Sequence, residues 1–389
     1  MDARPKNNPW RRTPKRSSPL FSFLDLPSTE LREQDFWERT RRNNPPFMFM
    51  KRLAVVFVLI LSQCLLLQVS SAQFVPASPP IADPADSRFR GVMEDWSTPA
   101  LRTSTLKPTE PLIGYVNEYP GYTVELIQVQ WRFGDPLDLY VMKPTGVKKP
   151  AVILYLYGYP ADTDRFKNEG FQQAVTKDGF AAVGFVSALT GHRYHDRPMR
   201  EWFISELQEC LATSAHDVQM VLDYLSTRND LDMTRVGMFA QGSGASIGIL
   251  TSAVESRIKV LDAIDPWGAW PIWMANSPFP PEDERAHYVT PEFLSKVAKL
   301  EPVDWLPKIK AQKFRLQDAI FDPITPKAAK EKLRASVPAG STVVIYKTPE
   351  DFNAVVRSKT DLAWIKRELR ALPDSKSTGA NVRPESPRD

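Results

Sequence analysis

A serine stands in a glycine-rich turn between an apolar strand pattern and a helix pattern, a setting for nucleophilic chemistry. The turn is Ala240-Gln241-Gly242-Ser243-Gly244; it follows the run Val236–Phe239 and precedes the run Ala245–Val254. Such a turn can expose a side chain at the carboxyl end of a sheet, where a hydroxyl activated by a neighbouring base attacks a carbonyl carbon. The sequence holds four histidines, His192, His195, His216 and His287, of which His192 and His195 are candidates for the base.

Two of these histidines lie in a loop after the apolar run Ala181–Val186. His192, His195 and Asp196 could bind a metal ion, exchange protons with a ligand, or form structural hydrogen bonds, and the His-x-x-His spacing does not separate these interpretations. No further cluster of metal-ligand residues stands nearby in the sequence, so we expect no metal and no other cofactor. We expect His216 to be structural. His287 reaches the site only if a long insertion folds over it.

Tryptophans gather in that insertion, which spans about 267–307 and is rich in Trp and Pro. Trp267 and Trp270 follow Asp265 at the end of a strand pattern, and we expect Trp202 to join them from the other side. Tryptophans at a cleft stack on sugars, aromatic rings or peptides, or they pack an insertion against the sheet. Both interpretations remain open, and both place Asp265 near the same edge of the sheet.

The elements that position these residues alternate between strands and helices. The predicted strands are 125–131 and 137–143 as a hairpin, then 151–156, 181–186, 236–239, 258–264, 313–319 and 342–346. The predicted helices are 163–177, 201–211, 216–225, 245–254, 327–335 and 361–372. This alternation predicts an α/β domain with a mostly parallel central sheet and helices on both faces. We place this domain at 120–373, after an extended lead-in over 73–119 and before a polar, disordered tail over 374–389.

From about residue 120 to 372 the chain resembles the α/β-hydrolase superfamily, and within it the branch of dienelactone hydrolases, acetyl esterases and prolyl-oligopeptidase-like enzymes. Besides the turn around Gly242, two segments carry the resemblance: Asp217-Val218 with Leu222-Asp223-Tyr224-Leu225, and Asp322-Pro323-Ile324-Thr325-Pro326. The resemblance implies the α/β-hydrolase fold. It also implies a nucleophile at the turn, an acid after a late strand, a histidine after the last strand, and two N–H donors for an oxyanion.

Measured against that pattern, the catalytic triad is degenerate. Gly242 stands at the nucleophile position, where glycine keeps the turn and removes the reacting side chain. Ser243 either caps the following helix or acts as a substitute nucleophile. Asp322 takes the acid position. The histidine position falls on Asp351, whose carboxylate is a poor acceptor for a serine proton.

The oxyanion side of the pattern is present. Tyr157-Gly158-Tyr159 follows the strand at 151–156, and by the resemblance the N–H groups of Tyr159 and Ser243 are the two donors. The other interpretation is a simple turn that needs Gly158 for its backbone shape. Together with Gln241 and Gly242, these residues form the expected pocket wall.

The net positive charge of the chain comes from its N-terminal part. Residues 1–72 hold 12 basic and 6 acidic residues, and the remainder has a net charge of −2, so the folded part gives no charge argument for nucleic acid. Lys51-Arg52, an apolar run and Ser70-Ser71-Ala72 are typical of a signal peptide over 48–72, cleaved after Ala72. The alternative is a membrane anchor formed by an uncleaved leader. Residues 1–47 are a basic disordered extension or reflect a mis-assigned start. We expect a secreted or periplasmic protein.

Three functions follow from these expectations. The first is a catalytically impaired protein that binds a small molecule, a sugar or a peptide. The second is an active ester or peptide hydrolase that uses Ser243 and Asp322 with a non-standard histidine, such as His192 or His195. The third is a structural subunit whose tryptophan-rich face binds another protein.

Overall fold

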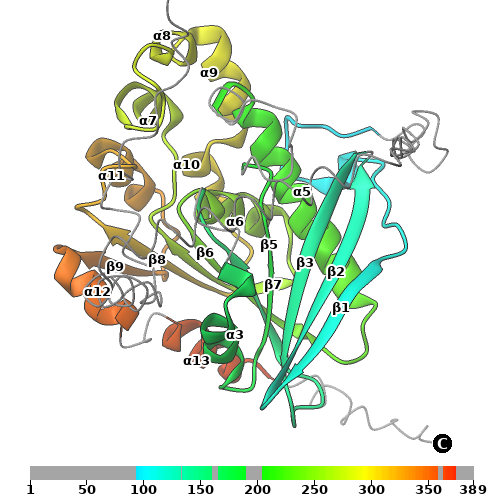
Figure 1. Cartoon of the computed structure of the whole chain (residues 1–389). Helices are drawn as coiled ribbons and strands as arrows, with labels where there is room; N and C mark the ends of the chain where they lie inside the picture. Colours follow the sequence, from blue (N-terminus) through cyan, green and yellow to red (C-terminus); the bar gives the residue numbers. More distant parts are fainter. Residues whose placement is uncertain (1–92, 133, 160–164, 190–203, 358–361, 374–389) are drawn as a thin grey trace, which may run out of the picture. The chain divides into compact units, whose positions relative to one another are not determined.

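Nine strands form one mixed sheet in the part of the chain that the structure describes (Figure 1). The structure is a computed structural model and describes residues 93–132, 134–159, 165–189, 204–357 and 362–373. The strands are β1 Leu112–Tyr119, β2 Tyr122–Arg132, β3 Asp135–Pro144, β4 Ala151–Leu156, β5 Ala181–Phe185, β6 Asp232–Gln241, β7 Ile258–Ile264, β8 Lys313–Ala319 and β9 Thr342–Tyr346. They lie side by side in the order β1-β2-β3-β5-β4-β6-β7-β8-β9.

The helices between these strands include short ones in the insertion. The described helices are α3 Glu169–Thr176, α5 Leu207–Ser226, α6 Ser243–Val254, α7 Trp270–Asn276, α8 Arg285–Tyr288, α9 Pro291–Val297, α10 Pro302–Trp305, α11 Lys327–Ala335, α12 Pro349–Arg357 and α13 Ala363–Ala371. Single 3-10 turns lie at Leu101–Thr103, Arg165–Lys167, Ala298–Leu300 and Leu306–Lys308. None of the described helices is long and apolar enough to cross a membrane.

Pairing in the sheet changes from antiparallel to parallel along its width. β1, β2, β3 and β5 pair antiparallel, and β5, β4, β6, β7, β8 and β9 pair parallel. The predicted hairpin is confirmed as β2 and β3, and the mostly parallel sheet is confirmed by the pairs from β5 to β9. β1 is absent from the sequence-based prediction. Its irregular pattern has a physical cause, because most of this edge strand is exposed and a bulge interrupts it near Gly114.

Helices cover both faces of the sheet, as expected. In β4, Val152 and Leu154 face a core shared with α5, α6 and the insertion, while Ile153 and Tyr155 face a core shared with α3 and α13 (Figure 1). Because successive side chains of a strand point to opposite faces, a strand buried on both sides reads as one continuous apolar run. That run is what predicted β4.

The parallel strands end at one edge of the sheet. Leu156 of β4 pairs with Ala240 of β6, Gln241 pairs with Ile264 of β7, and Ile264 pairs with Gln317 of β8. The loops that follow these strands therefore start next to one another. The chain continues from β4 to β5 on one side and then to β6 on the other, and in open α/β sheets ligands bind at such a switch point.

α5 corrects one sequence-based prediction. Two helices were expected at 201–211 and 216–225, and the structure has one continuous helix over Leu207–Ser226. The intervening Ala212-Thr213-Ser214-Ala215 contains no glycine or proline to end a helix.

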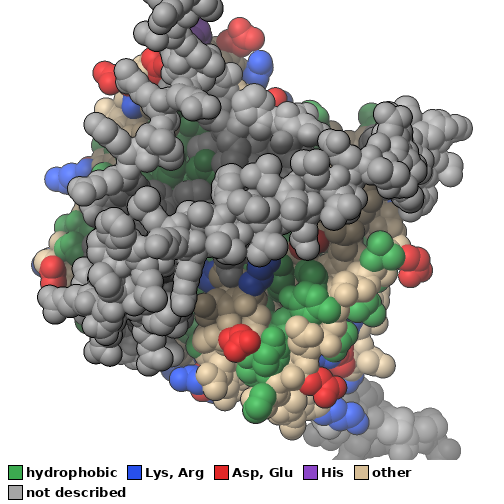
Figure 2. Space-filling model, viewed as in Figure 1, with side chains coloured by type: hydrophobic (Ala, Val, Ile, Leu, Met, Phe, Trp, Pro, Cys, Tyr) green, Lys and Arg blue, Asp and Glu red, His purple; other side chains and the backbone are tan. Residues whose placement is uncertain are grey.

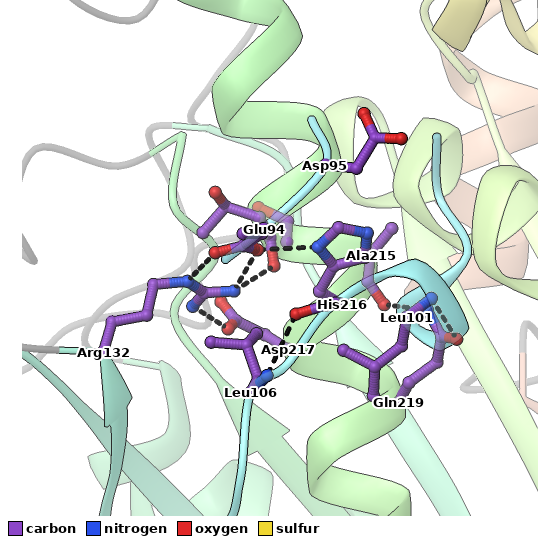
Figure 3. A network of polar contacts seen from close by, with 12 residues as sticks. Glu94, Asp95, Leu101, Leu106, Arg132, Ala215, His216, Asp217 and Gln219 are labelled. Atoms are coloured by element: carbon purple, nitrogen blue, oxygen red, sulfur yellow. Dashed lines mark hydrogen bonds and ion pairs between the residues drawn. The ribbon is translucent and has the colours of Figure 1, made fainter. Parts of the chain in front are cut away.

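α5 also anchors the segment that precedes the sheet, through a buried polar network (Figure 3). Arg132 of β2 donates to Glu94 over 2.5 and 2.6 Å and to Asp217 over 2.5 Å. His216 contacts Glu94 through Nδ1 over 2.6 Å and the carbonyl oxygen of Thr98 through Nε2 over 3.0 Å. Burial works to raise the pKa of Glu94, but the hydrogen bonds from Arg132 and His216 hold it below its ordinary value. His216 is therefore structural, as expected.

The outer strand β1 is the least covered part of the sheet. Leu112, Ile113 and Val116 are largely exposed. In Figure 2, hydrophobic side chains lie among polar and acidic ones over the part of the surface that β1 to β3 form.

Candidate functional site

The turn between β6 and α6, which we call the elbow (Gln241–Ser243), has the backbone shape of a nucleophile elbow. Gly242 adopts φ 57° and ψ −123°, a conformation that glycine reaches freely and other residues only with strain. Its N–H donates to the carbonyl oxygen of Ile264 over 2.8 Å. A Cβ atom built at Gly242 would lie 3.5 Å from both Gly158 Cα and Trp267 Nε1, which is ordinary contact. The position therefore has room for the first carbon of a side chain but carries none.

The loop after β4 packs directly on this elbow. A Cβ atom at Gly158 would lie 3.0 Å from the carbonyl oxygen of Gln241 and 3.4 Å from Gly242 Cα. A contact of 3.0 Å is tighter than most contacts that real Cβ atoms make, so glycine allows the two loops to meet. The close approach supports the interpretation of Gly158 as part of the site rather than of an isolated turn.

Ser243 is the first residue of α6 and is fully buried. Its Oγ accepts a hydrogen bond of 2.9 Å from the N–H of Tyr159. The expectation that Ser243 caps the helix is wrong, because Gly242 is the N-cap residue and no side chain caps this end. The hydroxyl is bonded instead to Tyr159, in the loop after β4. The backbone group expected to bind an oxyanion thus donates to a side chain of the protein itself.

The two tyrosines that flank Gly158 point to different faces of the sheet. Tyr157 is buried among the rings of Tyr155, Phe166, Phe171 and Phe239, with centroids 6.0 to 6.3 Å away. Tyr159 is half-buried and lies 6.0 Å from the ring of Phe279 in the insertion. Of the pair, only Tyr159 is placed beside the insertion, and Gln241 lies half-buried at the end of β6.

The tryptophans of the insertion form a packed cluster. Trp267, Trp270 and Trp273 are 2% exposed or less, and the Trp267 and Trp273 rings stack at 5.1 Å. Trp270 donates from Nε1 to the carbonyl oxygen of Leu300, and its backbone N–H donates to Glu301. Burial raises the pKa of Glu301. These contacts fit the interpretation in which the tryptophans bury the insertion against the sheet, and they leave no tryptophan-rich surface for a partner protein among the described residues.

Carboxylates from the ends of β7 and β8 meet around a buried lysine. Lys330 of α11 donates to Asp265 over 2.9 Å, to Asp318 over 3.2 Å and to the carbonyl oxygen of Ala319 over 2.7 Å. Arg334, one helical turn along, also pairs with Asp318. A small recess lies beside this group, lined by Asp265, Asp318, Lys330 and Arg334 with Pro266, Leu316 and Leu333.

Burial and the neighbouring charges shift the pKa values of the groups in this cluster. Burial raises the pKa of Asp265 to about 7, with the Lys330 ammonium opposing and the Asp322 carboxylate adding to the rise. Burial likewise raises the pKa of Asp322, whose Oδ1 accepts from the N–H of Ile324 over 3.2 Å. Burial acts against the charge of Lys330, but the surrounding carboxylates raise its pKa above the ordinary value. Asp265 also has a positive φ of 45°, a rare conformation for a residue other than glycine.

The position expected for a catalytic histidine is exposed to solvent. Asp351 is exposed in the first turn of α12, and its N–H donates to Thr348 Oγ1 over 3.2 Å. α12 itself was not predicted. Of the histidines that the structure describes, His216 is held in the Glu94 network and His287 is exposed on α8. His192, His195 and Trp202 lie outside the described residues.

Three residues that sequence reasoning missed shape the site. Phe279 packs between Tyr159 and Trp267, Ser246 bonds the backbone of Trp267, and Lys330 neutralises the acids. The sequence held one signal for Lys330, because it stands three residues before Leu333 and therefore on the same face of α11. Among the described residues, no group of three or more His, Cys, Asp or Glu side chains is arranged to hold a metal ion.

Comparisons with known proteins find similarity at the level of structure. No protein-family model matches the sequence, and no curated protein sequence matches it. The chain is similar to the acetyl xylan esterase from Paenibacillus sp. R4, with 15% identity and a TM-score of 0.52 over 67% of this chain and 89% of that one. It is also similar to acetyl xylan esterase 1 from Thermoanaerobacterium sp. JW/SL YS485, with 12% identity and a TM-score of 0.53 over 69% and 90% of the two chains. With the strand order and the elbow at Gly242, these matches show that the chain has the α/β-hydrolase fold.

Proposed function

We propose that this chain is an exported protein that binds a ligand at the elbow edge of the sheet and has lost the hydrolytic activity of enzymes with this fold. The observation that carries the proposal is Gly242, which adopts φ 57° and ψ −123° at the nucleophile position but has no side chain to react. Removing the nucleophile alone eliminates most of the catalysis in a triad enzyme.

The surroundings of Ser243 support this proposal. A nucleophilic hydroxyl has to face the substrate and contact a base. Ser243 is fully buried, and its Oγ already accepts the hydrogen bond from Tyr159. The described histidines are bonded or placed elsewhere, since His216 contacts Glu94 and His287 lies on α8 in the insertion.

The ligand that we propose is a small molecule, a sugar or a peptide. The groups that the structure places within 4 Å of a Cβ atom built at Gly242 are uncharged, namely the backbone of Gly158 and the indole of Trp267. Acetylated sugars are the first ligands to examine, because the two similar structures reported above are acetyl xylan esterases.

Hydrolysis of a small aryl ester tests the loss of activity. The unsubstituted protein and the Ser243→Ala variant should hydrolyse p-nitrophenyl acetate at the same slow rate. Ser252→Ala is the matched control, since it removes a buried serine from the same helix at a distance from the elbow. Turnover that Ser243→Ala abolishes and Ser252→Ala preserves would overturn the proposal.

That contradicting result would identify the alternative function, an active ester or peptide hydrolase. In this alternative, the hydrogen bond between Ser243 Oγ and the N–H of Tyr159 breaks and Ser243 becomes the nucleophile. Asp322 would be the acid of the triad, and His192 or His195 would be the base. No contact of the described residues favours it, so it enters here as an outcome of the same assay.

Export is a separate part of the proposal and rests on the sequence of residues 48–72. Cleavage after Ala72 would give a mature chain that begins at Gln73. Mass spectrometry of the N-terminal peptide from secreted material should find Gln73 as the first residue. A cell-associated product that retains residues 48–72 would contradict cleavage and favour an anchor.

A further inference from the structure

The hydrogen bond between Tyr159 and Ser243 lies where this fold would bind the oxygen of a substrate. Hydrolases of this kind place backbone N–H donors 2.7 to 3.1 Å from the position that an oxyanion occupies. Ser243 Oγ lies 2.9 Å from the nitrogen of Tyr159. An oxygen of the protein therefore has the distance from this donor that the oxygen of a ligand would have.

We infer that the hydroxyl of Ser243 fills the oxyanion subsite, so that the chain blocks its own position for a ligand's carbonyl or anionic oxygen. This inference rests on the proposed function, because a hydroxyl that fills the subsite is not at the same time a nucleophile. Beyond that function, it assigns Ser243 a role: its hydroxyl occupies the oxyanion subsite and so inhibits the binding of a ligand's oxygen there.

The packing around the bond keeps it closed. Gly158 brings the loop after β4 so close to the elbow that a Cβ atom there would lie 3.0 Å from a carbonyl oxygen and 3.5 Å from the nitrogen of Ser243. Ser243 is fully buried and belongs to α6, a helix of 12 residues whose other side chains are mostly buried. The loop after β4 and the elbow therefore cannot separate without breaking these contacts.

The bond also has an energetic reason to persist. An N–H group that is left without an acceptor in a buried site costs about 1–3 kcal/mol. The hydroxyl satisfies the N–H of Tyr159 inside the protein, so an incoming carbonyl oxygen replaces one hydrogen bond with another and gains little. Without the hydroxyl, the same N–H and the start of α6 are both open to an anion.

Removing the hydroxyl should therefore create an anion site. We expect Ser243→Ala to bind phenylphosphonate at least about 10-fold more tightly than the unsubstituted protein, because a hydrogen bond to a charged group contributes about 1.5–3 kcal/mol and about 1.4 kcal/mol corresponds to a 10-fold change in affinity. Ser252→Ala, which removes a buried hydroxyl of α6 that has no hydrogen-bond partner among the described residues, should bind as the unsubstituted protein does.

Amide exchange of Tyr159 gives a readout that needs no ligand. In protein labelled with 15N-tyrosine, the Tyr159 signal is the one that disappears in Tyr159→Phe. This N–H should exchange slowly in the unsubstituted protein and in Ser252→Ala, and faster in Ser243→Ala.

Two results would overturn the inference. One is fast exchange of the Tyr159 N–H in the unsubstituted protein. The other is equal phenylphosphonate affinity in the unsubstituted protein and in Ser243→Ala. Neither result concerns ester turnover, so failure of this inference and failure of the proposed function are seen in different measurements.

Discussion

Ser246 and Trp267 exchange two hydrogen bonds, each of 2.8 Å. The hydroxyl of Ser246 donates to the carbonyl oxygen of Trp267 and accepts from its N–H. The pair joins α6 to the first residue of the tryptophan cluster and holds the Trp267 indole beside the empty position at Gly242. One buried side chain therefore hydrogen-bonds the elbow helix to the insertion.

Replacing Ser246 with alanine should weaken this junction. The backbone N–H of Trp267 would lose its acceptor in a buried site, and we expect the free energy of unfolding to fall by about 1–3 kcal/mol. Urea unfolding of Ser246→Ala against Ser252→Ala measures the effect. Equal stability of the two variants would show that the Ser246 bonds contribute nothing to the fold.

Restoring a serine at Gly242 should be possible but should not restore catalysis. The built Cβ has ordinary contacts at 3.5 Å, while the positive φ should cost about 1–3 kcal/mol in unfolding free energy. With Asp351 at the histidine position, the new hydroxyl has no base there. Gly242→Ser should hydrolyse p-nitrophenyl acetate no faster than Gly242→Ala. A higher rate in the serine variant alone would mean that an unrecognised base reaches the elbow.

Asp265 should make the stability of the protein depend on pH. In the folded state burial raises its pKa to about 7, and in the unfolded chain an aspartate titrates near 4. Between these values the folded state binds the additional proton, so the free energy of unfolding decreases as pH rises, by up to about 1.4 kcal/mol per pH unit.

Asp265→Asn tests this dependence with little change in shape. Asparagine tolerates the positive φ of this position, and its carbonyl oxygen can accept from Lys330 and from the N–H of Ala319. Urea unfolding at intervals from pH 4 to 7 should show a smaller decrease in the variant. An unchanged decrease would assign the pH dependence to other groups.

Lys330 should be the most stabilising lysine of α11. Lys330→Met removes the ammonium that three oxygens share and leaves the buried Asp265 without this cation, while Asp318 keeps its pair with Arg334, which should cost about 3–5 kcal/mol. Lys327→Met is the matched control, because Lys327 lies on the same helix with a side chain that is 87% exposed. Similar midpoints of thermal unfolding in the two variants would contradict this role.

Local patterns were sufficient for much of the sheet. The ranges 258–264, 313–319 and 342–346 were predicted to the residue as β7, β8 and β9. Apolar and β-branched residues mark β7 and β9, and Phe314 and Leu316 alternate with polar residues in β8. The positive φ at Gly242 also followed from the strand–turn–helix pattern. β1 escaped prediction because an exposed edge strand has no buried face to impose an alternating pattern.

The contacts of the site were less accessible to sequence reasoning. Tyr159 and Ser243 are 84 residues apart, and nothing in either local sequence indicates that the hydroxyl of one accepts from the N–H of the other. Serine at the start of a helix is a common cap, and here tertiary packing overrode that preference. The tryptophans allowed two interpretations because aromatic residues suit both cores and clefts, and only their burial separates the two.

Fluorophosphonate labelling tests most directly the central claim that the elbow lacks an activated serine. The purified protein, shown to be folded by circular dichroism, is treated with the probe and analysed by intact mass and peptide mapping. The account predicts no adduct, since Gly242 has no side chain and Ser243 is buried with its Oγ bonded to Tyr159. A stoichiometric adduct on Ser243 would contradict it and show that the serine is exposed and activated in solution.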